Sequence, residues 1–223
     1  KGSDNLSIPL VSIILMICFF ELIPPSNHSI IDMIIIEKIF SLILIIGILF
    51  LSYKIDSLNI NGLFGGIIMG IIIFTLGSYS YVIPIAVFFI LSSLLGKVLN
   101  HASFYKQKES GRNIIQVYSN GGIGLLICIY NYFHPDPINF LLFLSSTSAA
   151  MSDTWGTEFG KLSKNKPISI ITFKKINHGL SGGITKIGTL GSLLGSCFIG
   201  AVGWFLNFQS PFLIYGIIFS GFS

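Results

Sequence analysis

The chain has 223 residues, of which 52% are hydrophobic and only 10% are charged, and its mean hydropathy is +0.82. Soluble domains carry about 25% charged residues, so this composition excludes an ordinary soluble globular protein. The net charge of +4 does not indicate a nucleic-acid partner, because the lysines fall in loops beside apolar stretches. We therefore expect residues 1–223 to form a single, all-α polytopic integral membrane domain.

Apolar runs mark the candidate membrane helices, and several are shorter than the roughly 20 residues of a full span. There are eight such runs: Ile8–Ile23, Ile34–Leu51, Leu63–Leu76, Tyr81–Leu95, Ile114–Phe133, Ile138–Ser152, Gly188–Phe208 and Phe212–Phe222. They predict about seven or eight transmembrane helices, some of them short or broken, with re-entrant segments as the alternative. A ladder of small residues predicts close helix packing: Gly62, Gly65, Gly66 and Gly70.

The placement of lysine and arginine predicts the orientation of the chain. With the N-terminus in the cytoplasm, the loops at 97–112 and 161–187 both face inward and together carry most of the basic residues. The opposite loops, Pro24–Ile31, Gly77–Ser80 and Asn131–Pro137, contain none. The positive-inside rule therefore places both basic loops, and the candidate site described next, at the cytoplasmic face.

Two acids follow an apolar run that we expect to be embedded in the membrane. Ionisable groups at such positions are costly and are by default functional candidates. On an unbroken helix Asp153 and Glu158 would point about 140° apart and would not bind one ion, so we expect a helix break at Gly156 that opens a polar pocket. Mg²⁺ favours one or two carboxylates together with phosphate oxygens. The alternative is a structural carboxylate paired with a lysine or with Arg112.

A glycine-rich segment, His178–Thr189, precedes the next apolar run. Small residues, hydroxyls and free amides at a helix N-terminus favour phosphate binding. Lys174, Lys175 and Lys186 add positive charge around this segment. We expect an anion-binding turn, although glycines that only pack membrane helices are an equally good explanation of the pattern.

A polar stripe is expected at the start of the fifth apolar run. Arg112, Gln116 and Asn120 recur every four residues, which on a helix gives one continuous face. The guanidinium of arginine suits bidentate phosphate binding. The alternative is a hydrogen-bonded seam between helices, with Arg112 as a positive-inside anchor.

Taken together, these segments resemble one family of integral membrane proteins. The quoted blocks are FFILSSLLGK (Phe88–Lys97), GRNIIQVYSNGG (Gly111–Gly122), SAAMSDTWGTEFGKLS (Ser148–Ser163) and HGLSGGITKIGTLGSLLG (His178–Gly195). Their order and spacing resemble the family that includes plant plastid phytyl-phosphate kinase and transmembrane protein nineteen. The resemblance extends from about Leu58 to Gly195.

The resemblance implies a kinase that converts an isoprenyl monophosphate in the bilayer into the diphosphate, with CTP as the expected donor and Mg²⁺ as cofactor. It implies that Asp153 and Glu158 bind Mg²⁺ and that Arg112 binds one phosphate group. The other phosphate would be bound by the turn Ser181, Gly182 and Gly183 with Lys174 or Lys175. The positions that match the family blocks are Arg112, Gln116, Asn120, Asp153, Glu158, Ser181, Gly182, Gly183 and Thr189. Gln116 and Asn120 would orient oxygens or the ribose. Family members continue into a further Asp-containing segment, so we expect the chain to be truncated after Ser223.

Two alternatives stay open at this point. A CTP-dependent polyprenol kinase or a cytidylyltransferase would use the same residues on a different acceptor or with a different leaving group. A lipid or small-molecule transporter would account for a broken helix with charge inside the membrane. Membrane lipids are partners under each of these interpretations.

Overall fold

The structure is a computed structural model that describes residues 28–102, 111–178, 180, 182–206 and 211–222. The first apolar run, Ile8–Ile23, lies outside these residues. The chain forms two compact units. Unit 1 comprises Lys1–Val82 and Ser110–Pro135, and unit 2 comprises Ile83–Glu109 and Asp136–Ser223. Their elements are helices, apart from two strands of two residues each among the described residues.

Unit 1 contains α2 (His28–Lys54), the first part of α3 (Ile60–Ala102) and α4 (Ile114–Phe133). The start of α4 is fixed by a reciprocal cap: the side chain of Asn113 accepts from the Gln116 amide at 3.0 Å, and the Asn113 amide donates to Gln116 Oε1 at 2.9 Å. Such a capping box satisfies amides that would otherwise lack partners at a helix start. The bounds of α4 are those of the predicted apolar run.

A single residue, Ser78, interrupts α3. Its backbone angles, φ 61° and ψ −174°, are non-helical and cost a residue other than glycine about 1–3 kcal/mol. They divide α3 into parts of about 27 Å and 36 Å, at 1.5 Å per residue. The two apolar runs expected here, Leu63–Leu76 and Tyr81–Leu95, are therefore joined by one kink and not by a loop.

The glycine ladder in the first part of α3 packs against neighbouring elements of unit 1, as expected. A β-carbon at Gly65 would lie 2.7 Å from the side chain of Ile114. At Gly66 it would lie 3.1 Å from Leu49, and at Gly70 it would lie 3.1 Å from Ile45. These helices approach more closely than larger residues would allow.

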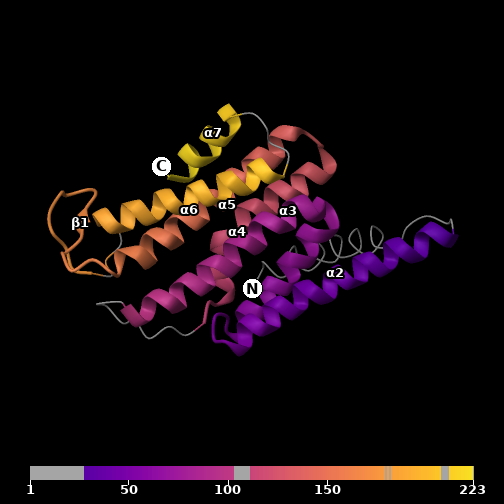
Figure 1. Cartoon of the computed structure of the whole chain (residues 1–223), viewed down its shortest axis with the longest axis horizontal. Coiled ribbons are helices and arrows are strands. Elements are labelled where there is room, and N and C mark those ends of the chain that lie inside the picture. The colour runs from indigo at the N-terminus through magenta and orange to yellow at the C-terminus, as the bar shows by residue number, and fades with distance from the viewer. Residues whose placement is uncertain (1–27, 103–110, 179, 181, 207–210, 223) are drawn as a thin grey trace, which may run out of the picture. The chain divides into compact units, whose positions relative to one another are not determined.

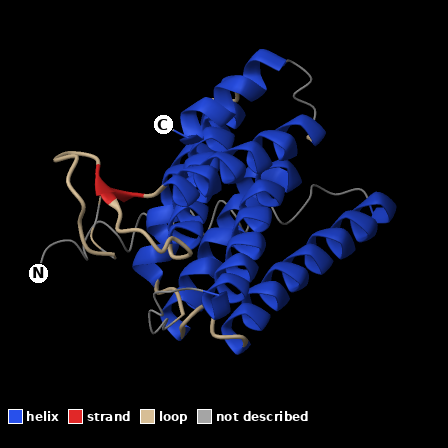
Figure 2. Ribbon diagram, turned by 60° about the vertical axis from the view of Figure 1, so that its left-hand side comes forward, coloured by secondary structure: helices blue, strands red, loops and turns tan. Residues whose placement is uncertain are grey.

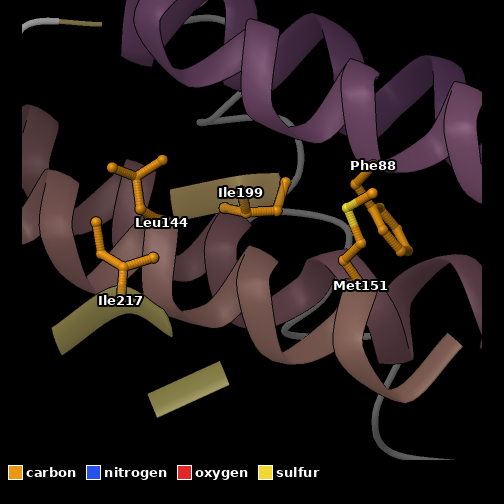
Figure 3. Close-up of a cluster of buried hydrophobic side chains, with 5 residues drawn as sticks. All are labelled: Phe88, Leu144, Met151, Ile199 and Ile217. Atoms are coloured by element: carbon orange, nitrogen blue, oxygen red, sulfur yellow. The ribbon is translucent and has the colours of Figure 1, made fainter. Parts of the chain in front are cut away.

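Unit 2 contains the end of α3 from Ile83, α5 (Pro137–Gly160), α6 (Lys186–Phe205) and α7 (Pro211–Phe222), and the last three lie side by side (Figure 1). Asp136 caps α5, its carboxylate accepting from the Ile138 amide at 2.8 Å, and Pro137 occupies the first turn, where proline is tolerated. The core of this unit consists of buried side chains from all four helices (Figure 3): Phe88, Leu144, Met151, Ile199 and Ile217.

The helices α5 and α6 pack backbone against backbone through glycines of α6. A β-carbon at Gly195 would lie 2.9 Å from the carbonyl oxygen of Met151, and one at Gly188 would lie 2.9 Å from the carbonyl oxygen of Gly156. Gly188 contacts the end of α5 and Gly195 its middle, so the two helices are antiparallel.

A small hairpin connects α5 to α6, within the predicted loop 161–187. Strand β1 (Ile168–Ser169) pairs antiparallel with β2 (Gly183–Ile184). In the register of the pair, Ile168 is opposite Ile184 and Ser169 is opposite Gly183. The hairpin extends beyond the ends of α5 and α6 (Figures 1 and 2).

Within the described residues, three helices are long and apolar enough to cross a membrane: the segment Ile60–Leu99 of α3, α4 and α6. Shorter apolar helices are formed by Ser41–Lys54 in α2 and Leu213–Phe222 in α7. These helices support an all-α integral membrane protein. The total of about seven or eight spans remains a prediction.

Candidate functional site

The helix that carries the two acids is not broken at Gly156. Helix α5 runs without interruption from Pro137 to Gly160 and includes both Asp153 and Glu158. The expected break is therefore wrong. The glycine at position 156 is explained by contact with α6. A β-carbon there would collide with the side chain of Ser192 and approach the carbonyl oxygen of Gly188. The glycine serves close packing and not an unwound turn.

Because the helix is continuous, the two carboxylates lie on different sides of α5. Asp153 is exposed, whereas Glu158 is buried and only 9% exposed. At about 100° per residue, Asp153 lies about 60° from Gly156 and about 20° from Gly160, two positions that contact the start of α6. Glu158 lies about 160° from both. The pair therefore does not fit a single Mg²⁺ ion held by both side chains.

Within the described part of the chain, no group of three or more His, Cys, Asp and Glu side chains could hold a metal ion. An alternative metal site made only of protein side chains is therefore not found among these residues. A site made by Asp153 alone with substrate phosphates still fits the preferences of Mg²⁺, which keeps several waters and takes one or two protein carboxylates.

Glu158 faces α3. One carboxylate oxygen, Oε1, accepts from Lys161 Nζ at 2.8 Å. The other, Oε2, is buried and has no hydrogen-bond partner within the described residues. A β-carbon at Gly96 of α3 would lie 3.7 Å from Oε2 and 3.6 Å from the carboxyl carbon. The absence of a side chain at Gly96 thus provides the space for this carboxylate.

Three further buried polar atoms lie on the same two helices of unit 2. The hydroxyls of Ser92 and Ser93 on α3, and the indole Nε1 of Trp155 on α5, have no hydrogen-bond partner among the described residues. Ser92 and Ser93 precede Gly96 by four and three residues, and Trp155 precedes Glu158 by three, so each lies one turn away on the same face. Buried polar groups of this kind are rare and call for water, an ion or a ligand.

Sequence reasoning identified Glu158 but missed the buried polar groups of Ser92, Ser93 and Trp155. The signal was present: two adjacent serines interrupt an apolar run, and a glycine follows one turn later in FFILSSLLGK. The run was interpreted as a membrane span and as one of the family blocks, and its serines were given no role of their own. The carboxylate oxygen can accept a hydrogen bond, the indole N–H can donate one, and each hydroxyl can do either.

The N-terminus of α6 lies beside the last turn of α5. Thr185 caps α6, its Oγ1 accepting from the Gly188 amide at 3.0 Å. A β-carbon at Gly160 would lie 3.6 Å from the same Oγ1. Thr189 is exposed and its hydroxyl donates to the Thr185 carbonyl at 3.0 Å. The structure thus brings the start of α6 to the side of α5 that carries Asp153, and not to the side that carries Glu158.

The residues expected to form an anion-binding turn belong to the hairpin. Gly182 has φ +75° and its carbonyl accepts from the Ile170 amide at 3.0 Å, while Gly183 lies in β2. A β-carbon at Gly183 would lie 3.0 Å from Ile176 and Pro167, so closing the hairpin explains this glycine. Ser181 lies outside the described residues. Lys174 and Lys175 are exposed on the loop that follows β1.

The polar stripe of unit 1 is only partly helical. Arg112 precedes the N-cap of α4 and forms a backbone bridge with Leu58, so it does not share a helix face with the other two residues. Gln116 is exposed and its Oε1 is used in the capping box, which leaves its amide N–H groups as donors. Asn120 is partly buried inside α4. The prediction of one continuous helix face is therefore wrong for Arg112.

The apolar helices of membrane length define an α-helical integral membrane protein. Its polar side chains include the acids of α5 and the hydroxyls at the start of α6, two helices that pack through glycines. The family model for Integral membrane protein DUF92 matches residues 43–223. The chain belongs to this family, which confirms the resemblance drawn from the sequence blocks.

Relatives come from archaea and plants. The uncharacterized membrane protein MJ0933 of Methanocaldococcus jannaschii is 38% identical over 173 residues, 76% of this chain and 71% of the relative. Protein PGR of Arabidopsis thaliana is 31% identical, over 80% of this chain and 65% of the relative. Protein VTE6, chloroplastic, from the same plant is 26% identical, over 75% of this chain and 53% of the relative. The chain thus spans between half and two thirds of the two plant relatives. No solved structure matches the chain significantly.

Proposed function

We propose that this chain catalyses phosphoryl transfer from a nucleoside triphosphate, with CTP as the expected donor, to an isoprenyl monophosphate of the phytyl or geranylgeranyl type. Membership of the family and the similarity to Protein VTE6 support this substrate class. We place the reaction at the cytoplasmic face, where a lipid-anchored phosphate meets a water-soluble nucleotide.

One observation carries the proposal: Asp153 is exposed on α5 one turn before Gly156, and Gly156 packs against Gly188 in the first turn of α6. A helix N-terminus attracts phosphate through its amides and its dipole. Lys186 and Thr189, both exposed in the first turn of α6, add a cation and a hydroxyl. An acid beside an anion-binding helix end is the arrangement expected where a metal-bound nucleotide is positioned.

Asp153 is the residue that would hold Mg²⁺. When bound, the ion would neutralise charge on the phosphate oxygens of the donor. The chain itself would align the groups, because phosphoryl transfer depends mainly on positioning and charge stabilisation. An oxygen of the prenyl monophosphate attacks the γ-phosphorus, the bond from that phosphorus to the β–γ bridging oxygen breaks, and the nucleoside diphosphate leaves. The acceptor is already ionised, so no strong general base is needed.

The other expected residues take separate roles in the proposal. Glu158, which is paired with Lys161 and packed at Gly96, positions α5 against α3. The family motif alone assigns Arg112 to a phosphate group, and Gln116 and Asn120 to nucleotide oxygens. Lys174 and Lys175 lie on the hairpin loop, and we assign them to the phosphates of membrane lipids.

The test is a radiolabelled phosphate-transfer assay on the purified chain in detergent, with and without Mg²⁺. CTP is compared with ATP, and phytyl and geranylgeranyl phosphates with the free alcohols. The proposal predicts labelled prenyl diphosphate and release of CDP. Release of pyrophosphate would identify a cytidylyltransferase, and labelling of the alcohol alone would identify a polyprenol kinase. Movement of the lipid across liposomes without nucleotide consumption would favour a transporter.

A further inference from the structure

The hairpin between α5 and α6 ends in a closed loop that one serine holds in shape. The Ser169 amide donates to the Lys174 carbonyl at 2.9 Å, and the Ser169 carbonyl accepts from the Phe173 amide at 2.9 Å. The hydroxyl of Ser169 accepts from the Thr172 amide at 3.2 Å. Residues 170–173, which we call the tip loop, are therefore fixed by three hydrogen bonds to one residue.

The tip loop presents large apolar side chains to its surroundings. Ile171 is 82% exposed, Phe173 is 81% exposed and Ile170 is 56% exposed. Phe173 has φ 53°, a left-handed conformation that is rare for a bulky side chain and that persists only where neighbouring contacts impose it. The loop thus holds this ring outward at a conformational cost. A cluster of exposed apolar side chains on a shaped loop indicates an interaction surface.

Positive charge surrounds this apolar tip. Lys164, Lys166, Lys174 and Lys175 are all exposed on the loops of the hairpin region. No acidic residue follows Glu158 in the chain, so the hairpin itself carries no negative side chain. A loop with apolar and cationic groups and no acids of its own is complementary to lipids that carry phosphate.

The position of the hairpin in the chain matches such a partner. It ends at Ile184, two residues before α6, and α6 is long and apolar enough to cross a membrane. The hairpin therefore lies at the boundary between a membrane span and water. At this boundary lysines extend their amines to headgroups while apolar side chains enter the acyl region.

We propose that the tip loop inserts into the headgroup–acyl boundary of an anionic leaflet, with Lys174 and Lys175 bound to lipid phosphates. The partner is the surrounding bilayer, and the insertion anchors the connection between α5 and α6. The proposal does not depend on the kinase assignment. It concerns the phosphates of lipid headgroups, not those of the nucleotide or the prenyl substrate, and it needs no nucleotide.

The test places a fluorescent reporter in the tip loop of the full chain in lipid nanodiscs, without nucleotide or prenyl phosphate. Phe173→Trp is the main reporter, Ile171→Trp the second, and Asn177→Trp, at an exposed position on the same hairpin, is the matched control. Emission from the native tryptophans is subtracted with the unsubstituted chain. Quenching by acyl-brominated lipid and by aqueous iodide is measured in phosphatidylcholine, with and without phosphatidylglycerol.

Brominated lipid should quench both tip reporters, iodide should quench only Asn177→Trp, and phosphatidylglycerol should strengthen the lipid quenching. Lys174→Gln with Lys175→Gln should lower the ratio of inserted to free hairpin by about 25-fold, roughly fivefold for each lysine near an anionic surface. Lys54→Gln should leave this ratio unchanged.

Three results would overturn the proposal. One is equal iodide quenching at the tip reporters and at position 177, and another is lipid quenching that ignores phosphatidylglycerol and both lysines. The third is protection from iodide and from brominated lipid together, which would mean that protein and not lipid covers the tip.

Discussion

The carboxyl carbon of Glu158 lies 3.6 Å from the position that a β-carbon at Gly96 would occupy. This relationship joins α3 to α5 at Glu158, the one buried acid among the described residues of unit 2. The missing side chain at Gly96 leaves space for the Glu158 carboxylate between the two helices.

The contact predicts different effects for small and large substitutions at Gly96. Gly96→Ala should retain stability or gain up to about 1 kcal/mol, because the methyl group meets ordinary van der Waals distances and alanine favours a helix. Gly96→Leu should lose about 1–3 kcal/mol, because the side chain must displace the carboxylate. Thermal unfolding followed by circular dichroism in detergent measures both. Equal stability of the two variants would contradict the contact.

The backbone packing of α5 on α6 predicts a strong effect at Gly195. Gly195→Ala should destabilise the chain by about 1–3 kcal/mol, because its β-carbon would lie 2.9 Å from the Met151 carbonyl oxygen, which the helix holds in place. Gly216→Ala is the matched control, since a β-carbon there would have nothing within 4 Å. The same unfolding experiment compares them, and a tolerated Gly195→Ala with a harmful Gly216→Ala would refute this packing.

A third prediction concerns the only arginine of the chain. Arg112→Lys should lower kcat/KM for phosphate transfer about tenfold or more, equivalent to ~1.4 kcal/mol, because a point charge does not replace a planar bidentate donor. The backbone bonds of Arg112 to Ser57 and Asn59 are unaffected by the change, so the fold should persist. Kinetics identical to those of the unsubstituted chain would return Arg112 to the role of a positive-inside anchor.

Apolar runs predicted most of the described helices, because hydropathy reports burial in lipid directly. Helix α4 begins and ends as expected, and α6 and α7 differ by only a few residues from the predicted runs. The run that ended at Ser152 stopped too early. Helix α5 continues through a polar stretch to Gly160, where α6 and α3 supply the contacts that hydropathy does not register.

Local sequence was a poorer guide to the site. A glycine between two acids is compatible with a helix break or with close packing, and only the position of Ser192 on α6 decides between them at Gly156. The hairpin was also missed, because strands of two residues leave no alternating pattern. Ser92 and Ser93 lie inside an apolar run, and their burial depends on tertiary packing.

The most direct test of the account is the turnover of Asp153→Asn with CTP and a prenyl monophosphate in detergent. The matched control is Asp56→Asn, an exposed acid with φ 58°, a conformation that asparagine also tolerates. We predict that Asp153→Asn lowers kcat by about a hundredfold or more, as loss of a group that stabilises transition-state charge does, while its circular dichroism spectrum and the turnover of Asp56→Asn stay unchanged. Unaltered turnover by folded Asp153→Asn would contradict the placement of the phosphate-transfer site between α5 and the start of α6.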